Sequence, residues 1–366
     1  MLLLSTGCPK PASQSPSNTE ADHSTPRPSV ALRVLIVNEP AMVDAITRLR
    51  GEWAERSGGE LTASAATWND LSTAKTLDAD VIIFPSRYLG ELCTRAWLRP
   101  VRGSLLENKD FNSPDIFPLV RNELIKWGGQ TMALPLGIDP TTILPSTSEP
   151  GSILLLKQAA PHAISNERLG VLFDADTMKP RITEPAFVEA LTQLAQADGQ
   201  SKANDEPAPA SGAQHPPVLG NGDRLIAVTT SSHNAASAFK LIEWLAKPDT
   251  SSQFARVGNR VLPARLSSAS SSAWYEPSLA ADKRSDLAKA LTAALSGEQC
   301  LLIPRIPGID EYMAALDDAV KAAVVDKLPP QETLHKAAER WEQITTAHGR
   351  DQQRDAYQKH LGISDK

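Results

Sequence analysis

The chain has 366 residues, of which 41% are hydrophobic and 22% are charged, and its formal net charge is -6. This length is sufficient for one large or two ordinary domains, and the composition is that of a soluble globular protein. The negative charge argues against a nucleic-acid partner, because a general nucleic-acid binder needs a basic face to neutralise phosphates. No apolar run approaches the roughly 20 residues that a membrane-spanning helix requires.

The first 30 residues contain a cysteine between two unlike segments. Three leucines at 2–4 precede the sequence STGC at 5–8, and residues 9–30 hold five prolines and five serines. Small residues before a cysteine resemble the lipobox of bacterial lipoproteins, although Ser5 stands where a leucine is usual and a basic leader is missing. We expect Cys8 to be a lipid-attachment site, the following segment to be a disordered tether, and the rest of the signal to lie upstream of this start. The alternative is a ragged terminus with an incidental cysteine.

The other two cysteines, Cys93 and Cys300, sit among apolar neighbours and are expected to be buried, inert thiols. The chain contains no CxxC, HExxH, GxSxG or GxxxxGK[ST] motif, and no GxGxxG after a strand. Asp174 and Asp176 have the spacing of a calcium loop, but Lys179 occupies the position that requires glycine. We therefore expect no cofactor, no metal ion and no catalytic activity.

A regular pattern of strands and helices begins at Ala31. A β-branched run at 31–38 predicts a buried strand, 60–67 predicts a second strand, and the continuous apolar run at 78–85 is typical of the middle of a parallel sheet. Between the first two strands, residues 38–40 open a helix whose inward face carries Ile46, Leu49 and Trp53. Alternating strands and helices predict an α/β domain whose functional edge lies at the carboxyl ends of its strands.

The remainder of the chain is richer in helix. Residues 128–137 read as a hairpin arm leading to a buried strand, 199–217 as a polar, proline-rich loop, and 223–230 as a returning strand. Helical periodicity predicts four helices, at 182–196, 234–247, 310–328 and 330–348. Three tryptophans lie on apolar faces and are assigned to the core: Trp53, Trp244 and Trp341.

Six segments in chain order resemble a known family, the sugar-binding group of the extracellular solute-binding proteins of ABC importers, to which the maltose-binding protein belongs. For example, KPRITEPAFVEAL at 179–191 is similar to the family's turn TGKP-x-INSPAFVEAL. Likewise, the strand, helix and P-x-R sequence at 222–265 follows the family pattern. The six segments are 33–63, 78–101, 117–139, 172–194, 222–265 and 302–344.

The resemblance implies an α/β fold of two lobes, the type II periplasmic-binding-protein-like fold, which closes on a solute between the lobes without catalysis. Lobe I is assigned to 31–138 plus 218–262, and lobe II to 139–217 plus 263–366. The resemblance further implies a monomeric receptor in the periplasm or at the cell envelope, anchored to the membrane by lipid alone. Its implied partners are a small solute, expected to be a carbohydrate, and ABC permease subunits.

The second lobe departs from the family pattern. Family members have a long helical region before the TGKP-like turn and a further strand and helix after it, whereas here only 139–171 and 199–217 occupy those places. We therefore expect a reduced, helix-rich second lobe. This leaves open an alternative function, a degenerate homologue that acts as an envelope sensor or protein-interaction module without solute transport.

The resemblance and the strand ends together select candidate ligand-binding residues. Amide and charged side chains form paired hydrogen bonds with vicinal hydroxyls, and aromatic faces stack on the apolar side of a sugar ring. Two other readings stay open, namely that Asn38 caps the following helix and that Arg87 and Asp139 form an ion pair. The candidates are Asn38, Glu39, Trp68, Ser86, Arg87, Tyr88, Gly137, Asp139, Asn221, Asp223 and Tyr312.

Overall fold

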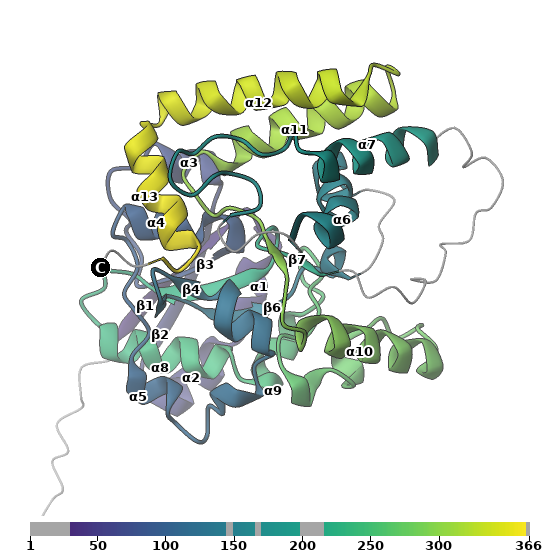
Figure 1. The fold of residues 1–366 in the computed structure, drawn as a ribbon. Helices are drawn as coiled ribbons and strands as arrows, with labels where there is room; N and C mark the ends of the chain where they lie inside the picture. Colours follow the sequence, from purple (N-terminus) through teal and green to yellow (C-terminus); the bar gives the residue numbers. More distant parts are fainter. Residues whose placement is uncertain (1–29, 144–148, 165–169, 198–215, 364–366) are drawn as a thin grey trace, which may run out of the picture.

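The residues described by the computed structural model are 30–143, 149–164, 170–197 and 216–363. Cys8, the tether and most of the expected loop at 199–217 lie outside these residues, so those expectations stay predictions. Figure 1 shows a β-sheet with surrounding helices, which we call the sheet part, and next to it a group of long helices, which we call the helical part.

The sheet part is built on five strands. β1 pairs in parallel with β2 and β3, whereas β8 runs antiparallel between β3 and β6. β3 and β8 are apolar runs with buried side chains on both faces, as expected for central strands. The α/β class is thereby confirmed. In spatial order the strands are β2 (Glu60–Ala66), β1 (Ala31–Val37), β3 (Val81–Pro85), β8 (Arg224–Val228) and β6 (Leu134–Gly137).

These strand directions determine where the connecting segments meet. β1, β2, β3 and β6 all end at one edge of the sheet, and because β8 is antiparallel, its first residue lies at the same edge. Arg224 of β8 is directly opposite both Pro85 of β3 and Gly137 of β6. Polar residues that follow four strands and precede the fifth are therefore gathered at this edge.

Helices α1 (Ala41–Arg48), α2 (Arg50–Ser57) and α8 (Ala235–Leu245) pack on the sheet. The single helix expected after residue 40 is divided at Leu49, although its inward face is buried as predicted. The rings of Trp53 and Trp244 stack at a centroid distance of 5.8 Å and tie α2 to α8. This pair confirms that both tryptophans belong to the core.

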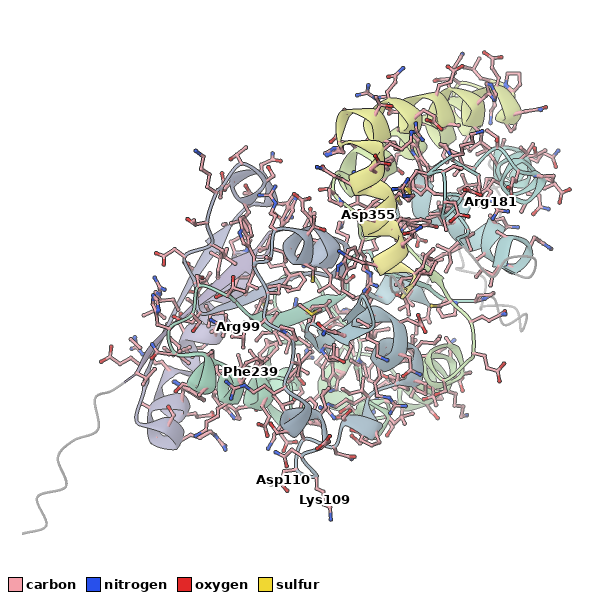
Figure 2. All side chains as sticks on the ribbon, turned by 60° about the vertical axis from the view of Figure 1, so that its left-hand side comes forward. Arg99, Lys109, Asp110, Arg181, Phe239 and Asp355 are labelled. Atoms are coloured by element: carbon pink, nitrogen blue, oxygen red, sulfur yellow. The ribbon has the colours of Figure 1, made fainter. Side chains whose placement is uncertain are left out.

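The remaining elements of the sheet part are short, apart from α10. Arg99 donates to the carbonyls of Thr229 and Thr230, the two residues that follow β8. Figure 2 shows Arg99 and Phe239 in the sheet part. The elements are α3 (Trp68–Ser72), α4 (Leu89–Thr94), α5 (Gly103–Leu106), β4 (Lys126–Trp127), β5 (Gln130–Thr131), α9 (Pro248–Ser251) and α10 (Ala281–Leu295).

The helical part has an aromatic core. Phe173 lies 5.3 Å from Tyr312, 4.8 Å from Trp341 and 5.5 Å from Tyr357, measured between ring centroids. Its strands β7 (Val218–Leu219) and β9 (Leu301–Leu302) have two residues each and pair in parallel. Figure 2 shows Arg181 and Asp355 on this side of the molecule. The helices are α6 (Gly151–Ala163), α7 (Pro185–Ala197), α11 (Ile309–Val324), α12 (Pro330–Ala347) and α13 (Arg350–His360).

The two parts are joined through a tightly packed segment before α11. A Cβ atom at Gly90 of α4 would lie 1.6 Å from the carbonyl oxygen of Arg305, so only glycine fits there. The buried guanidinium of Arg305 donates to the carbonyl of Leu124 and lies 3.3 Å from Nδ1 of His360. Burial, together with the neighbouring guanidinium, lowers the pKa of His360. The histidine is therefore a neutral acceptor at physiological pH.

The division of the chain into lobes stays a prediction, but one segment suggests a refinement. The guanidinium of Arg265 donates to the carbonyls of Phe111, Asn112 and Ala246, all of which belong to the sheet part. We therefore propose that the second lobe begins after this segment rather than at residue 263. Among the described residues, no helix combines the length and apolar character needed to cross a membrane.

Candidate functional site

Asn38 organises the first group of side chains at the polar edge of the sheet. It follows β1 with a φ of 60°, a left-handed conformation that asparagine tolerates better than most residues. Its side-chain oxygen accepts from the backbone N–H of Trp68 at 2.8 Å, and its amide donates to the hydroxyl of Tyr88 at 3.3 Å. Asn38 does not cap α1, whose N-cap position is Pro40.

The two aromatic candidates that follow β2 and β3 lie against each other. The rings of Trp68 and Tyr88 stack with centroids 3.9 Å apart and planes 7° apart. Trp68 is 8% exposed and Tyr88 is 3% exposed, whereas Asn38 beside them is exposed to solvent. A flat, buried aromatic pair thus lies beneath an accessible polar rim.

Asp310, in the first turn of α11, closes this group from the helical part. Its carboxylate accepts from the hydroxyl of Tyr88 at 2.8 Å and lies 3.4 Å from the guanidinium of Arg87. Burial and, second, the negative charge of Asp310 raise the pKa of Tyr88, so the phenol stays protonated and donates. We call Asn38, Trp68, Arg87, Tyr88 and Asp310 the Tyr88 cluster.

A second group surrounds the buried carboxylate of Asp223, immediately before β8. Its two oxygens accept from the hydroxyl of Ser86 at 2.9 Å, the N–H of Gly220 at 2.8 Å and the N–H of Asp139 at 3.0 Å. The side chain of Asp139 in turn accepts from Asn221 at 3.4 Å. Burial and, second, the charge of Asp139 raise the pKa of Asp223 to about 6. We call Ser86, Asp139, Asn221 and Asp223 the Asp223 cluster.

Arg87 connects the two clusters. Its Nε donates to the backbone carbonyl of Asn221 at 3.2 Å, while its terminal nitrogen pairs with Asp310. The ion pair considered from sequence between Arg87 and Asp139 is thus replaced by one to Asp310. A single guanidinium spans the loop before β8 and the start of α11, so it links the sheet part to the helical part.

Three candidates are turned away from these clusters. The carboxylate of Glu39 pairs with Nε of Arg224 at 2.8 Å, and both side chains are buried. A Cβ at Gly137 would meet the side chain of Val261, so this glycine serves close packing. Tyr312 is 0% exposed. Its hydroxyl bonds to Thr345 of α12 inside the helical core.

Asp310 and Arg224 are two residues at this edge of the sheet whose contacts sequence reasoning missed. Both act through partners more than 180 residues away, and no local pattern encodes such a pairing. A signal did exist for Tyr312, because it shares the apolar stripe of its helix with Leu316 and Val320. Within the described residues, no set of three or more His, Cys, Asp or Glu side chains is arranged to hold a metal ion.

Two surface grooves formed by the described residues lie outside the Tyr88 and Asp223 clusters. One, of about 560 Å³, runs between α11 and α12, and the other, of about 640 Å³, runs along α10. Because the rings of Trp68 and Tyr88 are buried and Asp310 bonds to the hydroxyl of Tyr88, binding at the polar edge of the sheet would require the contacts of Asp310 to open.

Several solved structures with the same fold are sugar-binding proteins or solute-binding proteins of ABC transporters. The sugar-binding protein MalE from Xanthomonas citri is 16% identical, with a TM-score of 0.61, and the match covers 87% of this chain and 98% of that one. A substrate-binding protein from Listeria monocytogenes in complex with cycloalternan is 13% identical, with a TM-score of 0.60 and coverage of 87% and 99%. A solute-binding protein from Thermotoga lettingae bound with α-D-tagatose is 15% identical, with a TM-score of 0.57 and coverage of 86% and 100%.

No protein-family model and no curated protein matches the sequence. The structural matches span nearly the whole length of each neighbour. The reduction of the second lobe stays a prediction. The chain therefore has the fold of the type II periplasmic binding proteins, as the sequence resemblance implied.

Proposed function

We propose that this protein is an exported solute-binding receptor of an ABC-type importer, and that it captures a carbohydrate at the Tyr88 cluster. The observation that carries the proposal is the flat pair of Trp68 and Tyr88, ringed by an amide, a guanidinium and a carboxylate. Aromatic faces suit the apolar side of a sugar ring, and the planar polar groups suit paired hydroxyls. The proposed role is binding without catalysis.

Capture requires the cluster to open, because both rings are buried in the present arrangement. Asp310 is the group that must move, since it reaches the sheet part from the first turn of α11. A relative motion of the two parts would withdraw its carboxylate from Tyr88 and Arg87. The hydroxyl of Tyr88 and the guanidinium of Arg87 could then donate hydrogen bonds to the hydroxyls of the solute. Such hinge closure around a ligand is a common motion of two-lobed proteins.

The test is thermal melting of the full chain by calorimetry with maltose, maltotetraose, ribitol and α-D-tagatose, which are the solutes bound by proteins of the same fold. A solute at about 100 times its dissociation constant should add about 2.7 kcal/mol to the free energy of unfolding. Trp68→Ala should abolish this gain. Trp97→Ala is the matched control, because Trp97 is also 8% exposed but lies outside the cluster. Absence of a shift with every carbohydrate would contradict the proposal.

A second candidate function is an envelope sensor or interaction protein without solute transport. Two observations favour it. The polar side chains of the Tyr88 cluster form hydrogen bonds and an ion pair with one another, and the strands of the helical part have only two residues each. If this candidate is correct, Asp310→Asn will change the melting temperature equally with and without sugars. If the receptor function is correct, the same variant will change the affinity for the solute.

The proposed location at the envelope depends on Cys8, which lies outside the described residues. Labelling of growing cells that express the protein from its own gene with a radioactive fatty acid should mark the protein. Cys8→Ser should lose the label and move the protein from the membrane fraction to the soluble fraction. A protein that stays in the membrane fraction after this substitution would contradict anchoring by lipid alone.

A further inference from the structure

The groove between α11 and α12 is separate from the proposed solute site. The two helices lie side by side at the outer edge of the helical part, joined by a short turn (Figure 1). The lining of the groove comes from successive turns of both helices, and its volume is about 560 Å³. Its α11 wall runs from Glu311 to Ala322, which corresponds to roughly 16 Å of helix, or about three turns.

The floor of the groove consists of small side chains. Ala315 and Ala322 of α11 are half-buried, and Ala337 of α12 is buried. Leu328, which lines the groove after the end of α11, is 41% exposed, and Val325, three residues earlier in the chain, is 62% exposed. Small residues allow the backbone of a third helix to approach closely, and exposed apolar residues at the end lengthen the apolar strip.

The two rims of the groove carry opposite charges. Glu311 and Asp318 line the α11 side, and Lys336 and Arg340 line the α12 side. The basic side chains bond to neighbours on their own helix, Lys336 to Glu332 at 2.7 Å and Arg340 to Gln343 at 3.0 Å, rather than reaching across the floor. On the α11 side, the carboxylate of Glu311 bonds to Nε2 of His348, just beyond the end of α12, at 2.9 Å. The groove thus has acidic side chains along its α11 rim and basic side chains along its α12 rim.

From this placement of small side chains and separated charges, we propose that the α11–α12 groove binds an amphipathic helix of a partner protein. The partner helix has an apolar stripe about three turns long, with basic residues along one edge and acidic residues along the other. Its mode of binding is that of a helix in a groove, in which apolar anchors give affinity and the edges give specificity. This inference does not depend on the proposed solute site.

The test measures binding of three synthetic 18-residue peptides to the full chain by fluorescence anisotropy in 150 mM salt. All three peptides carry the same leucine stripe on a helix-forming backbone. The mixed peptide has one lysine edge and one glutamate edge, and the other two have lysine on both edges or glutamate on both edges. Because a helix can lie in a groove in either direction, the mixed peptide always finds a matching alignment. It should bind at least tenfold more tightly than the other two.

Reversal of one rim distinguishes recognition from general stickiness. The double variant Lys336→Glu with Arg340→Glu has two acidic rims, so the all-lysine peptide should become the tightest ligand and the mixed peptide should weaken at least tenfold. The matched control is Arg284→Glu with Lys289→Glu, which makes the same charge change in the groove along α10. This control should leave the order of the three peptides unchanged. Circular dichroism establishes that both variants are folded.

Two results would overturn the proposal. One is failure of the mixed peptide to bind, or an order of peptides that is the same for the native chain and the rim variant. The other is a dimer in light scattering that Ala315→Phe converts to a monomer, because the occupant of the groove would then be a second copy of this chain.

Discussion

The sheet part buries charged and polar groups in specific pairs at its strand ends, whereas the helical part is held together by packed aromatic rings. The Arg224–Glu39 pair and the Asp223 cluster represent the first kind of core. Phe173, with its three aromatic neighbours, represents the second. The difference follows from the backbone, because strand ends and loops expose N–H and C=O groups that need partners, while helices satisfy most of theirs internally. Buried polar pairing is accordingly concentrated at the sheet edge.

Among the tests of this contrast, loss of the Arg224 guanidinium has the largest expected effect. Its side chain pairs with Glu39 and also donates to the carbonyls of Phe254, Val257 and Asn259. Arg224→Met leaves a buried carboxylate without its cation and should lower the free energy of unfolding by about 3–5 kcal/mol. Chemical denaturation measures the loss.

The matched control for that substitution is Arg260→Met. Arg260 pairs with Glu276 at the surface, where both side chains are more than 40% exposed. Its loss should cost less than about 1 kcal/mol. Equal costs for the two substitutions would mean that the sheet part does not depend on its buried pair.

The corresponding test in the helical part is Phe173→Leu. This change removes ring contacts with Tyr312, Trp341 and Tyr357, and should cost about 1–3 kcal/mol. Hydrogen exchange should accelerate in α11 and α12 while the amides of β1 and β3 remain protected. An equal acceleration in both parts would show that they unfold as one cooperative unit, which would remove the contrast at the level of stability.

The smallest expected effect lies in the Asp223 cluster and depends on pH. The folded-state pKa of Asp223, about 6, is raised above the ordinary value of 3.8. The stabilisation from this group is therefore fully present below pH 3.8 and is lost as the pH rises through about 6. Asp139→Asn removes the second cause of the pKa shift. Between pH 4 and pH 7, the free energy of unfolding of this variant should therefore decrease by about 1 kcal/mol less than that of the native chain.

Denaturation at a series of pH values measures this change. Asp110→Asn is the control, because Asp110 is exposed on the sheet part (Figure 2) and is not a member of the cluster. A pH profile of Asp139→Asn identical to that of the control would mean that the two carboxylates are not coupled.

Much of the framework was predictable because it depends on local patterns. The apolar runs of β1, β3 and β8 and the helical stripes of α7, α8, α11 and α12 each encode their own element. The division of the first helix at Leu49 was not predicted, because its apolar stripe continues through the break. The helices α6 and α10 were not singled out either.

The candidate site was predictable only in part, and for a physical reason. Residues that follow strands could be assigned to one edge, and Asn38, Trp68, Ser86 and Tyr88 do meet there. Which polar groups pair depends on contacts across the whole chain, so Asp310 and the partner of Glu39 could not be read from spacing. The role of the Tyr88 cluster in ligand binding stays a proposal.

The close stacking of Trp68 on Tyr88 has a consequence for spectroscopy. Indole emission responds to the polarity of its surroundings and to quenching by neighbouring groups, and Trp68 is the tryptophan in the Tyr88 cluster. Trp53, Trp244 and Trp341 lie in packed cores, so their fluorescence emission should change little when the cluster opens. The chain thus carries its own optical reporter, and the difference in emission between the native protein and Trp68→Phe isolates the signal of opening without any attached dye.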